Sequence, residues 1–107
     1  MTKPDPEREL PAELPSGWSA IGHDPSQSDS LARELTRECP MGHPLHDRAC
    51  RTHGRCDACD SVLFSVDDGR WAVVHLTWAR EHDLRWPHLE ALGTWDDALT
   101  AMTCHEH

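Results

Sequence analysis

Two apolar segments on either side of Asp68-Gly69 constrain the fold of this chain more than any other feature of its sequence. Residues 62–66 and 71–78 are rich in β-branched and aromatic side chains, which favour β-strands. The Asp-Gly pair is a strong signal for a two-residue hairpin loop, and such a loop would place Val66 opposite Trp71. Both faces of this hairpin are largely apolar, so we expect it at the centre of a sheet that is covered on both sides.

A helix is expected before the hairpin. A capping-box pattern begins at Ser26, and three side chains then follow at helical spacing. These side chains are Leu31, Leu35 and Cys39. Pro40 would end the helix, because the residue before a proline disfavours helical dihedral angles.

The remaining segments complete a predicted α+β fold. Thr94 would cap a last helix, with Asp97 three residues later. Residues 45–52 are a further candidate strand, and the polar residues 79–93 are typical of a long connection. This order predicts a small antiparallel sheet built on the central hairpin, with an N-terminal and a C-terminal helix.

The beginning of the chain has a different composition from the rest. Residues 1–17 contain four prolines among acidic and small residues, which is typical of a flexible tail. We therefore expect a tail over residues 1–17 and a single domain over residues 18–104. No stretch is apolar enough for a membrane span or a signal peptide, so we expect a cytoplasmic location.

The charge balance restricts the class of partner. The chain has 10 basic and 19 acidic residues and a net charge of −9. Nucleic-acid backbones are bound through lysine and arginine, so direct binding of DNA or RNA is disfavoured. A basic protein partner is compatible with this charge. Solubility alone is the simplest alternative explanation.

Cysteine and histidine concentrate in one short stretch. Residues 39–59 contain four of the five cysteines and three of the nine histidines. In a reducing compartment such residues are more often metal ligands than disulfides, and zinc takes thiolate and imidazole ligands in a tetrahedron. The predicted zinc ligands are Cys39, His43, Cys56 and Cys59. His46, Cys50 or His53 could replace His43 as the fourth ligand.

Each part of this pattern also has a simpler interpretation. Cys39 and Cys50 could be small buried apolar side chains, as free cysteine often is. A redox function of the C-x-x-C pair is less favoured, because the pair precedes a predicted strand rather than beginning a helix. His75 is expected to be a hydrogen-bonded core histidine. His105-Glu106-His107 is expected to be a frayed chain end.

Several short segments resemble a group of short bacterial proteins of uncharacterised function. They are DSVLF at residues 60–64 and VVHLTW at residues 73–78, followed by Trp86-Pro87 and Trp95. The resemblance covers about residues 43–102. It implies no activity, cofactor or catalytic residue.

Taken together, these patterns favour a small cytoplasmic binding protein, with zinc as a candidate stabilising ion and no identifiable catalytic residue. One alternative is an acidic inhibitor or immunity-type protein that masks a basic partner. Another is a zinc-dependent hydrolase, which would keep one coordination position open for water. Trp86, beside a proline in a polar segment, is the candidate anchor for a protein partner, with a position in the core as the alternative. The sequence leaves the identity of the partner and the oligomeric state open.

Overall fold

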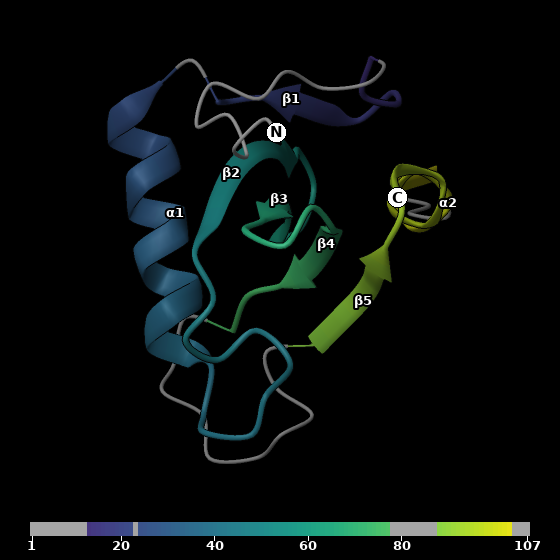
Figure 1. Ribbon diagram of the computed structural model, residues 1–107. Coiled ribbons are helices and arrows are strands. Elements are labelled where there is room, and N and C mark those ends of the chain that lie inside the picture. The colour runs from purple at the N-terminus through teal and green to yellow at the C-terminus, as the bar shows by residue number, and fades with distance from the viewer. Residues whose placement is uncertain (1–12, 23, 78–87, 104–107) are drawn as a thin grey trace, which may run out of the picture.

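The computed structural model describes residues 13–22, 24–77 and 88–103. Five strands form one antiparallel sheet in the order β1-β2-β3-β4-β5. The strands are β1 (Trp18–Ala20), β2 (Cys50–Cys56), β3 (Ser61–Val66), β4 (Trp71–His75) and β5 (His88–Gly93). The helices are α1 (Pro25–Glu38) and α2 (Trp95–Thr103). They pack on opposite faces of the sheet (Figure 1).

The predicted arrangement, a small sheet built on a central hairpin with an N-terminal and a C-terminal helix, is wrong. Strand β1 precedes α1 and pairs with β2, and strand β5 precedes α2 and pairs with β4. All five strands therefore belong to one sheet, of which the hairpin forms only two. Strand β1 has three residues, too few to show an alternating pattern. Strand β5 falls within the stretch that the sequence assigned to a connection, and its apolar residues do not alternate.

Strand β3 lies at the centre of the sheet and is buried at all six of its positions. Val62 and Phe64 pack in the apolar cluster beneath α1, and Leu63 packs in the cluster beneath α2. Because successive side chains of a strand point to opposite faces, β3 contributes to both clusters. In the described part of the chain, no helix has the length and apolar character needed to cross a membrane.

Helix α1 begins earlier than its sequence pattern predicted. Its N-cap is Asp24, whose carboxylate accepts a hydrogen bond from the backbone N–H of Gln27 at 3.2 Å. The predicted cap, Ser26, therefore lies inside the first turn. The helix ends at Glu38, in agreement with the expected effect of Pro40. The apolar side chains expected on this segment are buried against the sheet; they are Leu31, Leu35 and Cys39.

The predicted cap of α2 is confirmed. The backbone N–H of Asp97 donates to Thr94 Oγ1 at 3.2 Å, and the backbone N–H of Thr94 donates to Asp97 Oδ2 at 3.0 Å. This reciprocal pair is a capping box with an aspartate in place of the usual glutamate. It fixes the start of α2 directly after β5.

The hairpin forms, but its register is shifted by one residue from the predicted one. The N–H of Gly69 donates to the carbonyl of Val66 at 3.0 Å, and the N–H of Val66 donates to the carbonyl of Arg70 at 2.8 Å. The loop therefore holds three residues instead of two, and Ser65, not Val66, lies opposite Trp71. Three-residue hairpin loops use a type I turn followed by a left-handed residue, and Gly69 supplies it with a φ of +93°.

We expect the loop conformation to depend on Gly69. A β carbon at this position would meet no atom within 4 Å, so Gly69→Ala tests the backbone conformation alone. The substitution should lower the free energy of unfolding by about 1–2 kcal/mol, measured by urea denaturation, because an L-residue disfavours the left-handed region. Gly69→Asn should lower it less, since asparagine tolerates that region better. An alanine variant as stable as the parent would rule out the three-residue loop.

Candidate functional site

The predicted zinc ligands are divided between the two faces of the sheet. Cys39 packs in the apolar cluster beneath α1, whereas Cys56 packs in the cluster beneath α2. Cys59 packs against the same cluster as Cys56. His43 is buried, and its Nδ1 accepts the backbone N–H of Leu45 at 3.1 Å. The structure therefore brings Cys56 and Cys59 together but does not bring Cys39 to them.

The proposed substitute ligands are also separated. Cys50 packs against the cluster beneath α1, and His46 Nδ1 lies 3.3 Å from the carbonyl oxygen of Cys39. His53 lies on the other face, with Nε2 2.8 Å from Ser65 Oγ. Over residues 13–22, 24–77 and 88–103, no three side chains of histidine, cysteine, aspartate or glutamate are placed to share a metal ion.

Cys39 and Cys50 have the environment of unreactive thiols. Burial raises the pKa of Cys39 to about 12 and that of Cys50 to about 11. The carboxylate of Asp67 adds to the rise at Cys50. Both thiols are therefore neutral near pH 7, and they pack as small apolar side chains.

Cys56 and Cys59 form a contacting pair at the end of β2. Cys56 is buried in the cluster that contains Trp18 and Met102, and Cys59 is half-buried against the same cluster. Burial raises the pKa of the Cys56 thiol, and a hydrogen bond with Cys59 raises it further. A protonated thiol is a poor nucleophile, so this environment does not activate Cys56 for covalent chemistry. It remains suited to a metal ion, which displaces the thiol protons when it binds.

A polar cluster that the sequence did not predict lies at the first residue of β3, Ser61. Ser61 Oγ donates to Glu90 Oε2 at 2.8 Å and lies 3.3 Å from His75 Nδ1. In a serine-nucleophile relay, the imidazole stands between the hydroxyl and the carboxylate. Here the hydroxyl stands between the other two groups, so the cluster links three strands and does not activate Ser61. The expected hydrogen bond of His75 is present, although the side chain is half-buried.

Two β-bulges aim polar side chains at buried serines of β3. The register of β2 shifts between Thr52 and Gly54, which makes His53 the extra residue. The register of β5 shifts between the partners of Val73 and Val74, which makes Glu90 the extra residue. A bulge re-aims a side chain and breaks the alternating pattern along its strand. No periodicity in the sequence could therefore have identified these two residues.

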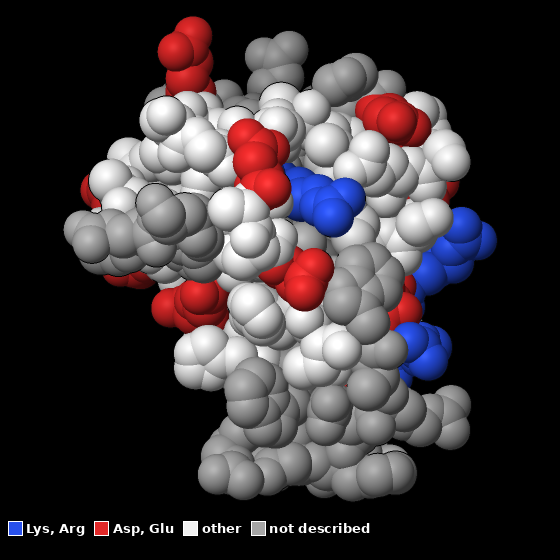
Figure 2. All heavy atoms as spheres, turned by 180° about the vertical axis from the view of Figure 1, so that it is seen from behind, with Lys and Arg blue, Asp and Glu red and all other residues white. Residues whose placement is uncertain are grey.

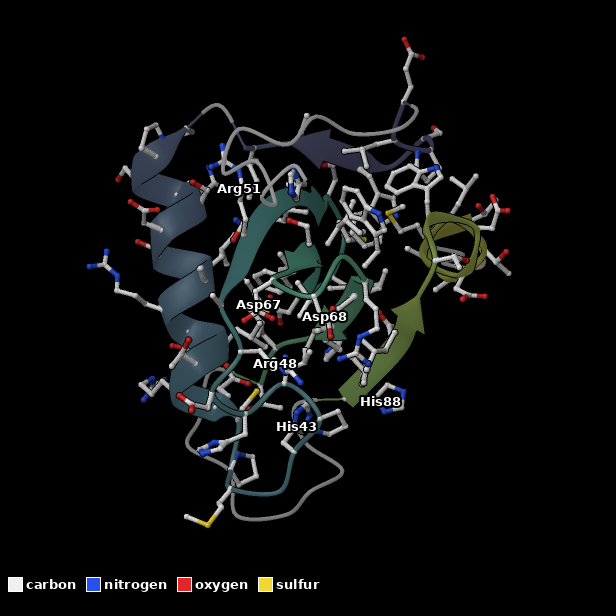
Figure 3. The ribbon with its side chains drawn as sticks, viewed as in Figure 1. His43, Arg48, Arg51, Asp67, Asp68 and His88 are labelled. Carbon is white, nitrogen blue, oxygen red and sulfur yellow. The ribbon has the colours of Figure 1, made fainter. Side chains whose placement is uncertain are left out.

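Charge is distributed unequally over the surface. The described arginines lie on α1, on β2 or beside the loops that precede β2 and β4; they are Arg33, Arg37, Arg48, Arg51, Arg55 and Arg70. Figure 2 shows basic side chains mainly toward the α1 edge and acidic ones spread over the same face. Arg48 lies beside Asp67 and Asp68, at 3.5 and 4.0 Å (Figure 3). Several arginine charges are thus partly neutralised locally.

The β2–β3 turn, β5 and α2 carry acidic residues and no described arginine. These residues form what we call the α2 side, defined as Asp57 and Asp60 in the β2–β3 turn, Glu90 on β5, and Asp96 and Asp97 on α2. Asp57, Asp96 and Asp97 are exposed. The elements of the α2 side thus carry five acidic residues and no described arginine.

Comparisons of this chain with protein-family models, curated protein sequences and solved structures found no match. The resemblance to short bacterial proteins therefore stays an expectation from the sequence. Trp78 and the candidate anchor Trp86 lie outside the described residues, as do most of the expected tail and the chain end from residue 104. The function argued below rests on the geometry and charge of the described residues.

The raised thiol pKa values predict a loss of stability at alkaline pH. Cys39 keeps its proton to about pH 12 when folded but releases it near 9.0 when unfolded. The contribution of the protonated Cys39 thiol to the unfolding free energy is thus fully present below pH 9. It is lost as the pH rises toward the pKa of Cys39 in the folded protein. Each such thiol should steepen the fall in unfolding free energy by about 1.4 kcal/mol per pH unit in this window.

The composition of the chain makes this measurement specific. The sequence has no tyrosine and a single lysine, Lys3, so few side chains other than the cysteines titrate between pH 9 and 11. Melting temperatures from pH 8 to 11 should fall less steeply for Cys39→Ala than for the parent. Thr36→Ala, an exposed substitution on α1 three residues before Cys39, should leave the steepness unchanged. Equal steepness in all three proteins would contradict the buried, protonated Cys39.

Proposed function

We propose that this chain is a small binding protein that engages a basic protein partner through its α2 side and performs no catalysis. The observation that carries the proposal is the separation of charge. Acidic residues occupy α2, β5 and the β2–β3 turn, while the described arginines lie elsewhere. A net charge of −9 gives the whole chain the same sign as this surface.

Such a surface favours some partners over others. Complementary charge raises the rate of encounter with a basic protein, and salt screens this attraction. The same charge opposes the approach of a phosphate backbone. A lysine- or arginine-rich protein surface is therefore the class of partner that the α2 side supports best.

The α2 side is held rigidly, which suits a preorganised binding surface. Ala98 and Met102 anchor α2 in the apolar cluster, and the indole N–H of Trp18 donates to the carbonyl of Met102 at 3.3 Å. The capping box fixes the other end of the helix. Little side-chain or backbone order would have to be gained on binding, so less of the interaction free energy is lost.

The described residues give little support to catalysis. Ser61 lies between His75 and Glu90 in an order that does not activate a hydroxyl, and the described thiols with raised pKa values are protonated near neutral pH. An inhibitor or immunity-type protein would use the same acidic surface to mask its target. That version of the proposal differs in its consequence, since the activity of the captured partner would be blocked.

A matched pair of double variants tests the proposal. Asp57→Asn with Asp96→Asn removes two of the five negative charges of the α2 side, whereas Asp29→Asn with Asp47→Asn removes the same charge elsewhere. Asn at position 47 also suits its positive φ of 61°. At low salt, a basic protein captured from the source cells should bind the first variant about tenfold more weakly and the second almost normally.

Two results would contradict this assignment. Equal weakening by the two double variants would mean that net charge alone, not the α2 side, determines binding. The parent protein could instead retain DNA or RNA, with the salt dependence typical of phosphate contacts. Nucleic acid, not a basic protein, would then be its class of partner.

A further inference from the structure

We propose that a groove between α1 and the start of β2 binds a small zwitterion whose ammonium and carboxylate groups are separated by a short apolar chain. The groove has a volume of about 370 Å³, within the range of roughly 300–1,000 Å³ that small-molecule sites occupy. Helix α1 contributes Asp29, Ala32, Arg33 and Thr36, and the chain that enters β2 contributes residues 48–50. The proposal does not depend on the proposed function, because the groove and the α2 side share no residue.

The helical wall of the groove carries charges of both signs. Asp29 and Arg33 are four residues apart, so they lie on the same face of α1, separated by about 6 Å along its axis. Both are exposed, and neither forms an ion pair with the other or with any other residue in the described part of the chain. Their charges are therefore available to a ligand.

Arg48 adds positive charge on the opposite wall. Thr52 Oγ1 donates to the carbonyl of Ser28 at 2.8 Å, which places this part of β2 beside the first turns of α1. Because the residues before it line the same groove, Arg48 lies farther toward the C-terminal end of α1. Its exposed ion pairs with Asp67 and Asp68 span 3.5 and 4.0 Å and are weak. The groove thus has a basic end and an acidic end.

The floor between the two ends is apolar. Ala32 and Cys50 pack against the cluster beneath α1, and Ala49 lies exposed beside Cys50. Burial raises the pKa of Cys50 to about 11, so its thiol is neutral near pH 7. Thr36 Oγ1 donates to the carbonyl of Ala32 at 3.2 Å, which leaves its proton unavailable to a ligand. Methylene groups placed on this floor would be removed from water, which favours binding.

The spacing of the charges selects the class of ligand. In an α-amino acid the ammonium and carboxylate groups are bonded to one carbon, so they are too close together to match Asp29 and Arg33. A chain of several methylene groups between them gives a better match. Such a chain occurs in a free ω-amino acid and in a lysine at the end of a protein chain, which carries its own carboxylate.

Titration of the full-length protein with 6-aminohexanoate, followed by NMR, tests the proposal. The ligand should cause saturable shift changes confined to the backbone amides of residues 29–36 and 48–50. Hexanoate and hexylamine each lack one of the two charges, so each should bind about tenfold more weakly. Added salt should weaken the binding of all three molecules, because it screens exposed charges.

Nα-acetyllysine distinguishes the two sources of this chemistry, since it presents the two charged groups as the end of a protein chain does. Tighter binding of Nα-acetyllysine than of 6-aminohexanoate would assign the groove to a C-terminal lysine. The reverse order would assign it to a free ω-amino acid.

Matched variants test whether the ligand lies in the groove. Asp29→Asn and Arg33→Gln should each weaken the binding of 6-aminohexanoate about tenfold. Asp47→Asn and Arg37→Gln remove the same charges from exposed positions outside the groove and should leave the affinity unchanged. Ala49→Leu should abolish binding by filling the floor. Its melting temperature should stay close to that of the parent, because residue 49 is exposed.

Three outcomes would overturn the proposal. One is the absence of saturable shift changes with 6-aminohexanoate. Another is equal weakening by Arg33→Gln and Arg37→Gln, which would mean that net charge and not the groove determines binding. The third is unchanged affinity in Ala49→Leu, which would place the ligand elsewhere. A protein that binds the zwitterion as proposed but captures no basic partner would disprove only the proposed function.

Discussion

The arrangement of this sheet depends on two buried hydroxyl groups. Strand β3 is buried on both faces, yet it carries Ser61 and Ser65. A buried hydroxyl without a hydrogen-bond partner is destabilising, so each serine requires one nearby. His53 and Glu90 supply these partners, and each is the extra residue of a β-bulge in a different strand. Each bulge thus supplies a hydrogen-bond partner for one buried serine of the central strand.

The bulges also determine how the neighbouring elements pack. In β5, the extra residue places Leu89 and Leu92 against the cluster beneath α1, while Ala91 joins the cluster beneath α2. A regular strand would have put Leu89 and Leu92 on opposite faces. In β2, His53 packs against Trp71, with ring centroids 5.1 Å apart. The two helices and the acidic α2 side follow from this division of side chains between the faces.

Local patterns in the sequence predicted the local features of the structure. The buried residues of α1, its end before Pro40 and the capping box at Thr94 depend only on neighbours within a few positions. The hairpin was predicted with the wrong register, because a three-residue loop and a two-residue loop share the same Asp-Gly signal. Strand β5 was missed because its bulge removes the alternation on which such predictions depend.

The residues of the candidate site were harder to predict, because their contacts join positions that are distant in the sequence. Spacing along the chain suggested that Cys39 and Cys56 could share an ion, but it carries no information about which face of a sheet each side chain occupies. The pairing of Cys56 with Cys59 was predictable, because one tight turn joins them. Ser61 and Glu90 meet only through the folded sheet, so no motif in the sequence marks them.

A double-mutant cycle between Ser65 and His53 tests most directly whether these bulge contacts organise the sheet. Ser65→Ala removes the hydroxyl, and His53→Phe keeps a ring against Trp71 while removing the hydrogen bond. Each single change leaves a buried polar group without this partner, and the double change relieves that penalty. The account predicts a coupling of about 1 kcal/mol or more in the free energy of unfolding. Effects that add to within about 0.3 kcal/mol would contradict it.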